Sequence, residues 1–150
     1  MGTCERKLTT MRKLIFTLLM TLILGEGVVY AHGEDKLGPN GGFIRMPGAF
    51  LTEVVPLSPN KLKVYLLDIN WENPSVLNSS LSLNLRSKET VQAKCDVQEN
   101  YYLCEFPMGV DLTLNGELSV DAQRENQKGN TVSYELPFKL EDIDDGHGGH

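Results

Sequence analysis

A two-residue period of apolar side chains runs through most of the chain and restricts its fold more than any other feature. Leu81, Leu83 and Leu85 alternate with polar residues, and residues 102–106 repeat the pattern. Successive side chains of a β-strand point to opposite faces, so this alternation indicates strands with one face on a core. No window between residues 43 and 140 shows a helical period. The chain is therefore expected to be all-β.

Turn residues divide this pattern into short strands. The expected strands cover residues 43–46, 50–57, 61–71, 81–86, 91–97, 102–106, 112–122 (as one bent strand or two) and 131–140. Short strands with frequent turn signals are typical of sandwiches, so we predict an antiparallel immunoglobulin-like β-sandwich of about 7–8 strands over residues 43–140. Residues 61–71 are apolar on both faces, which predicts a central strand with Trp71 as a core aromatic. An even strand count would bring residues near 42 and 141 to the same end of the sandwich.

The first 31 residues have the features of a cleaved signal peptide. Arg12 and Lys13 precede an apolar run of 11 residues, 14–24, and Val29-Tyr30-Ala31 forms a small-residue cleavage site. A helix that spans a membrane needs about 20 apolar residues. We therefore expect export to the periplasm or the medium, with no membrane span after processing. Residues 1–10 are interpreted as a possible start-site extension, because Met11 begins a conventional signal by itself.

Cleavage after Ala31 would leave 119 residues, enough for one domain with a proper core. The removed segment holds four basic and two acidic residues, so the formal charge falls from −6 to −8. An acidic domain lacks the electrostatic footprint for nucleic acid or an anionic membrane, and it suits a protein that meets cations. Solubility alone is the alternative explanation for these charges.

Cys95 and Cys104 remain after cleavage. A two-residue turn at Glu99-Asn100 would pair them directly across a hairpin, with Asp96 opposite Leu103. An exported compartment favours a disulfide between them. The alternative is a pair of thiolates that binds copper or zinc.

The three histidines outside the predicted signal, His32, His147 and His150, all lie in terminal segments, and residues 43–140 contain none. At a mature N-terminus, His32 can chelate Cu(II) through its α-amine and Nδ1, and Glu34 and Asp35 can add oxygen ligands. The tail, residues 141–150, combines two imidazoles with four carboxylates. A frayed flexible segment at 32–42 and a solvated tail at 141–150 are the alternatives.

Met46 and Met108 are the only methionines after the predicted cleavage site. Their thioethers are weaker candidates as Cu(I) ligands, and packing is the alternative role. The chain has no HExxH motif, nucleophile elbow or phosphate loop. Aspartates and glutamates are scattered, many at positions expected to face solvent. No catalytic residue is therefore assigned, and the protein is not expected to be an enzyme.

Three segments together resemble a known family. They are residues 38–42 (GPNGG), 48–55 (GAFLTEVV) and 64–68 (VYLLD). This order resembles periplasmic heavy-metal proteins of Gram-negative bacteria, which include small copper-associated exported proteins and metal-binding domains of metal-efflux adaptors. Their pattern is approximately HGPxGG, then GxxHxE, then a strand ending in aspartate. The resemblance implies a β-sandwich with a metal-related role.

The departures from that pattern fall on its histidines. Leu37 and Asn40 stand where the family often has His beside the Gly-Pro turn, and Leu51 stands where it often has His before Thr-Glu. Leucine cannot bind a metal, so the resemblance implies that the fold is kept without its central site. The terminal histidines would then be the remaining ligands.

These features predict an exported metal-binding protein that handles copper or assists heavy-metal efflux through its terminal histidines. Its cofactor would be a copper ion, or zinc or another divalent metal, and its partner a metal-efflux or other envelope protein. The alternative is an immunoglobulin-like interaction module of the cell envelope that binds no metal.

Overall fold

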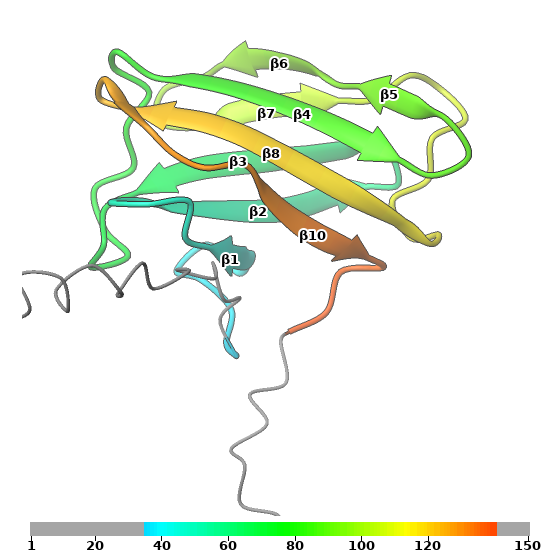
Figure 1. Cartoon of the computed structure of the whole chain (residues 1–150), viewed down its shortest axis with the longest axis horizontal. Helices are drawn as coiled ribbons and strands as arrows, with labels where there is room; N and C mark the ends of the chain where they lie inside the picture. Colours follow the sequence, from blue (N-terminus) through cyan, green and yellow to red (C-terminus); the bar gives the residue numbers. More distant parts are fainter. Residues whose placement is uncertain (1–34, 141–150) are drawn as a thin grey trace, which may run out of the picture. The chain divides into compact units, whose positions relative to one another are not determined.

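A computed structural model describes residues 35–140, which form two antiparallel sheets packed face to face (Figure 1). Sheet A has the order β1 (Phe43–Arg45), β2 (Leu51–Ser58), β3 (Lys61–Leu67), β7 (Tyr102–Glu105), β6 (Lys94–Val97). Sheet B has the order β10 (Val132–Leu136), β8 (Gly116–Arg124), β4 (Ser80–Arg86), β5 (Thr90–Gln92), and β9 (Gln127–Lys128) also pairs with β8. This confirms the predicted antiparallel β-sandwich. The expected signal peptide and tail lie outside the described residues.

The core lies between the sheets. It contains the inward residues of both sheets, among them Leu62, Val64, Leu83, Leu118 and Val120. A smaller cluster of Ile44, Leu51 and Leu67 lies apart from this core. The pairing of Ile44 with Glu53 and of Glu53 with Tyr65 puts this second cluster on the outer face of sheet A. Within residues 35–140, the structure has no helix that is long and apolar enough to cross a membrane.

The hairpin of β6 and β7 has the predicted register. Cys95 pairs with Cys104 and Asp96 with Leu103, and the Gln98 amide donates to the Tyr101 carbonyl at 2.8 Å. The two cysteines form a disulfide, with Cα atoms 4.1 Å apart. Cys104 is fully buried in the core and Cys95 lies partly buried against it. The disulfide therefore joins an edge strand, β6, to its neighbour from the core side.

The prediction of one continuous strand over residues 91–97 was wrong. β5 belongs to sheet B and β6 to sheet A, and the chain crosses between the sheets at Ala93, whose amide donates to the Leu83 carbonyl at 3.0 Å. Val91 and Cys95 both pack against the same core from opposite sheets. The apolar alternation therefore continues across the crossing and does not reveal it.

Three other strand boundaries differ from expectation. β3 is central in sheet A, as predicted, but ends at Leu67, and Trp71 follows in a turn with φ of 67°. β8 begins only at Gly116, so residues 112–115 belong to a turn. A further short strand, β9, lies between the expected strands at 112–122 and 131–140, and β10 ends at Leu136 because Pro137 has no amide proton to continue the ladder. With β5 and β6 separate, the described residues form ten strands rather than about eight.

Side chains close the sandwich along β1 and β10. The Tyr134 hydroxyl, from β10, lies 2.8 Å from Thr52 Oγ1 and 3.0 Å from the Thr52 carbonyl oxygen on β2. It also donates to the Phe43 carbonyl at 3.3 Å. The Arg45 guanidinium stacks over the Tyr134 ring at 4.7 Å, and its Nε donates to the Ser133 carbonyl at 3.0 Å. These contacts bind the two sheets at the edge where the covalent chain does not cross.

The disulfide is expected to stabilise the fold. Cys95 and Cys104 are separated by nine positions, and closing a loop of this length stabilises a fold by about 2.5–3 kcal/mol. Reduction, or the double variant Cys95→Ala/Cys104→Ala, should lower the free energy of unfolding by about that amount in urea titrations. Val97→Ala, at an exposed position of the same hairpin, is the control and should change it by less than about 0.5 kcal/mol. Equal losses of unfolding free energy in the double cysteine variant and in Val97→Ala would contradict a stabilising role for the disulfide.

Two buried tyrosines make a matched pair for the next test. Tyr134 is fully hydrogen-bonded, whereas the buried Tyr102 hydroxyl has no hydrogen-bond partner among the described residues. Tyr134→Phe should lower the free energy of unfolding by about 1–2 kcal/mol, because it removes a bonded group. Tyr102→Phe should leave it unchanged or raise it, because the removed hydroxyl is desolvated without compensation. Urea denaturation of the two variants measures both changes.

The tyrosine variants should also differ in how their free energy of unfolding depends on alkaline pH. Burial raises the pKa of Tyr134 above its ordinary value of about 10 and also raises the pKa of Tyr102. The unfolded chain then loses these protons first, so stability is full below about pH 10 and falls as the pH rises further. Tyr134→Phe should lose stability less steeply than the native chain between about pH 9 and pH 11. If the stability of Tyr134→Phe and of the native chain fell equally steeply with pH, the raised pKa of Tyr134 would be contradicted.

Candidate functional site

The Gly-rich turn at residues 38–42 is bound to a buried carboxylate. Glu53 on β2 is fully buried, and its Oε1 accepts hydrogen bonds from the amides of Asn40 at 2.8 Å and Gly42 at 3.0 Å. Its Oε2 accepts a third from Asn40 Nδ2 at 2.8 Å. All three partners are donors, which suits a carboxylate because its oxygens only accept when it is ionised. The segment expected to be flexible thus contains a turn fixed from beneath by one side chain.

The glycines of this turn fit its close approach to β2. A Cβ on Gly38 would lie 2.5 Å from Glu53 Oε1, and one on Gly42 would lie 2.6 Å from the Val54 carbonyl oxygen. Gly41 has φ of 77°, a conformation that favours glycine. The turn itself is closed by the Gly38 amide, which donates to the Gly42 carbonyl at 2.8 Å. The GPNGG sequence is therefore accounted for by packing against Glu53.

Asp68, which ends the third segment of the family-like pattern, has a similar role in the turn after β3. Its Oδ1 accepts from the amides of Asn70 at 2.9 Å and Glu72 at 3.0 Å, and its Oδ2 accepts from Asn73 Nδ2 at 2.7 Å. The hydrogen bond from Asn73, with that from Glu72, lowers the pKa of Asp68. The carboxylate folds the chain back after Leu67, which is why β3 does not continue to Trp71.

Leu51, at the position where the family often has histidine, is fully buried. It packs with Ile44 and Leu67 on the outer face of sheet A, and Tyr65 and Trp71 lie against them. Trp71 is therefore part of this outer cluster and not of the core between the sheets. Within residues 35–140, no group of three or more histidine, cysteine, aspartate or glutamate side chains could hold a metal ion.

The predicted metal ligands have different locations. Asp35 is exposed at the start of the described chain, and His32, Glu34, His147 and His150 lie outside the described residues. Both methionines are accessible, Met46 at 39% and Met108 at 96% exposure.

The two methionines lie at opposite ends of the sandwich. Met46 follows Arg45, which pairs with Thr52 near the start of β2. Met108 follows β7, whose last residue, Glu105, pairs with Lys61, and Lys61 pairs with Ser58 at the far end of β2. Roughly 20 Å of strand separates these ends. One ion therefore cannot take both thioethers.

Both ends of the described chain run close to the edge formed by β1 and β10. The Phe43 ring, at the start of β1, stacks on the Phe138 ring with centroids 5.2 Å apart, and Phe138 also meets the Tyr134 ring edge-on at 6.0 Å. Phe43 and Phe138 therefore lie together, and residue 141, which an even strand count was expected to bring to the same end as residue 42, lies outside the described residues. The segment before β1 runs over the outer face of sheet A, where Lys36 Nζ lies 5.3 Å from the centroid of the Trp71 ring.

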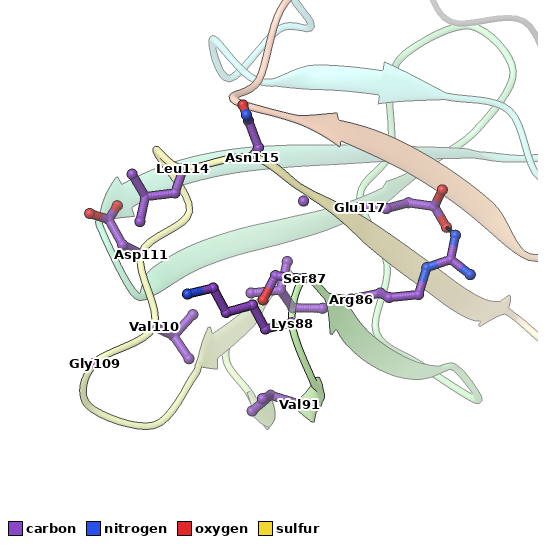
Figure 2. A pocket seen from close by; sticks show the side chains of 12 residues that line it. Arg86, Ser87, Lys88, Val91, Gly109, Val110, Asp111, Leu114, Asn115 and Glu117 are labelled. Carbon is purple, nitrogen blue, oxygen red and sulfur yellow. Dashed lines mark hydrogen bonds and ion pairs between the residues drawn. The ribbon is translucent and has the colours of Figure 1, made fainter.

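A cleft that sequence inspection did not indicate opens at the end of the sandwich where β4 meets β5 (Figure 2). It has a volume of about 850 Å³ and lies between the β4–β5 hairpin and the connection from β7 to β8. Leu85, Val91 and Val110 supply apolar surface, and Leu114 at the rim is 63% exposed. No motif marks these residues, because the cleft forms only where two separate turns meet.

Four charged residues line the cleft and their formal charges cancel. Arg86 and Glu117 form an ion pair at 3.0 Å. Lys88 and Asp111 also line it, and neither has an ion-pair partner within residues 35–140. The Thr113 hydroxyl and amide donate to Asp111 Oδ1 at 2.5 and 2.9 Å, and these bonds lower the pKa of Asp111. Asp111 is therefore a carboxylate at neutral pH.

Comparison with family models, curated proteins and solved structures gives no match for this chain.

Replacing Glu53 tests whether its carboxylate fixes the Gly-rich turn. Glu53→Gln puts an amide donor among three donors, so at least one hydrogen bond is lost in a buried site. The free energy of unfolding should fall by about 1–3 kcal/mol in denaturant titrations, and the amides of Asn40 and Gly42 should exchange faster with deuterium. Glu105→Gln, at an exposed position of sheet A, is the control. Unchanged exchange at Asn40 and Gly42 would refute this role of Glu53.

Proposed function

We propose that the protein binds copper at its chain ends, through His32, His147 and His150, with Glu34 and Asp35 as oxygen ligands. The contact between the Phe43 and Phe138 rings is the observation that carries this proposal. It holds the residues that lead to the two His-bearing segments beside each other at one edge of the sandwich. All histidines after the predicted cleavage site belong to those segments.

The chain segments that lead to His32 and to His147 are long enough for their histidines to share one metal site. His147 lies nine positions after Phe138, and an extended chain of that length spans up to about 30 Å. His32 is three residues before Asp35, a reach of up to about 10 Å. On the sandwich itself, Leu51 beneath Trp71 and Val54 opposite Phe43 are three residues apart along β2, or roughly 10 Å. The combined reach exceeds this separation.

The ligand set favours copper among the divalent metals. Imidazoles and a terminal amine are nitrogen donors, which Cu(II) binds more tightly than the other first-row divalent ions do. Zinc also accepts imidazole and carboxylate, and is the second choice. The acidic charge of the chain adds a general attraction for cations. In this role the sandwich is a scaffold, and the protein binds the ion without catalysing a reaction.

The resemblance to periplasmic heavy-metal proteins and the signal-like N-terminus support an exported location. A copper carrier or an accessory to a metal-efflux system is the role that fits both. Buried Leu51 agrees with a family member that has lost the central site of the sandwich and moved its ligands to the ends.

Calorimetric titration of Cu(II) tests the proposal. The protein is purified as the host processes it, and mass spectrometry first establishes its N-terminal residue. His32→Ala should weaken binding at least tenfold, because the chelate of amine and imidazole is lost, and the triple variant with His147→Ala and His150→Ala should remove the remaining affinity. The visible absorption of the Cu(II) complex should shift as nitrogen ligands are lost.

The control is the double variant Met46→Leu/Met108→Leu, which should bind Cu(II) as the native chain does. Native protein that binds Cu(II) no more tightly than the triple histidine variant would refute the proposal.

A further inference from the structure

The cleft at the β4–β5 end has the features of a binding site for an organic molecule. Its volume of about 850 Å³ lies at the upper end of the range of about 300–1,000 Å³ found for ligand pockets. Leu85 and Val91 belong to the core side of sheet B, so the cleft reaches apolar surface at the open end of the sandwich. Such sites usually combine apolar walls with a few polar groups that orient the ligand.

The charges of the cleft restrict the class of ligand. Arg86 and Glu117 neutralise each other, which leaves one amine, Lys88, and one carboxylate, Asp111, without an ion-pair partner within residues 35–140. A cleft with no net charge gives no attraction for phosphates or other polyanions. A ligand that carries one charge of each sign, on an apolar body, would pair both groups.

Uncharged polar groups of the cleft add donors and acceptors. Ser87 and Asn115 line it and can each donate and accept a hydrogen bond (Figure 2). A peptide backbone offers both donors and acceptors in alternation, whereas a lipid chain offers neither. The exposed Leu114 side chain stands at the rim, next to Asn115, where an apolar ligand side chain can cover it.

We propose that this cleft binds a short peptide with an apolar side chain and free ends. Lys88 pairs with its terminal carboxylate, Asp111 pairs with its terminal ammonium, and the apolar side chain covers Leu114 and Val110. The proposal does not depend on metal binding at the chain ends, because it uses only side chains that lie within residues 85–117. The two proposals can therefore fail separately.

The test uses the tripeptide Ala-Leu-Ala and protein labelled with ¹⁵N, purified as the host processes it. Titration should shift the amide signals of residues 86–89 and 109–116 and leave those of the distant loop at 72–79 unchanged. Lys88→Ala and Leu114→Ala should each weaken binding at least fivefold. Both side chains are exposed, so the variants should fold as the native chain does.

Matched control variants test whether the peptide binds in the cleft or elsewhere on the surface. Lys128→Ala on β9 and Leu77→Ala in the β3–β4 connection remove exposed side chains of the same types elsewhere, and they should bind as the native chain does. Ala-Leu-Ala with an acetylated N-terminus and an amidated C-terminus should bind at least tenfold more weakly.

Three results would overturn the proposal: no shift of the cleft signals at millimolar peptide, equal affinity in cleft and control variants, or equal binding of the blocked peptide. Free leucine that binds as tightly as the tripeptide would also overturn it, in favour of an amino-acid site.

Discussion

The Tyr134 hydroxyl is the contact on which the closed shape of the sandwich depends. Covalent connections join the two sheets through the loops after β3 and β7 and through the crossing at Ala93. Nothing covalent joins β10 to β1 and β2, so that edge is held by non-covalent contacts, which include a hydrogen bond from the Asn130 amide to the Pro47 carbonyl at 2.8 Å. Tyr134 bonds to both of the latter strands, and Arg45 stacks on its ring. The same edge carries Phe43 and Phe138, whose rings stack with centroids 5.2 Å apart.

The segments that suggested a metal site serve the scaffold instead. Glu53 holds the GPNGG turn, Asp68 folds the chain after β3, and Leu51 fills a cluster beneath Trp71. Each of these residues acts on backbone amides or apolar neighbours. In this chain the three segments therefore help to cover the outer face of sheet A.

Local chemistry predicted much of the fold. Alternation of apolar residues identified the strands, and hairpin geometry fixed the pairing of Cys95 with Cys104, because both depend on neighbours in sequence. The crossing at Ala93 was not predictable, because side chains from either sheet face the same core and the alternation continues. Glu53 was missed for a related reason. A glutamate in a strand is expected to face solvent, and only the turn that returns over sheet A buries it. Two signals were available: its place after a loop rich in glycine, and its match to the glutamate of the GxxHxE pattern.

The strand lengths have a consequence for self-association. The strands that end the two sheets, β1, β6, β10 and β5, have three to five residues. Of the inner strands, β2, β3, β4 and β8 have seven to nine residues and β7 has four. β5 and β6 are also parts of one continuous segment that changes sheets at Ala93. A strand from another molecule that adds to any edge can therefore form only a short ladder before its partner turns away. Sheet proteins with such short edges resist edge-to-edge aggregation.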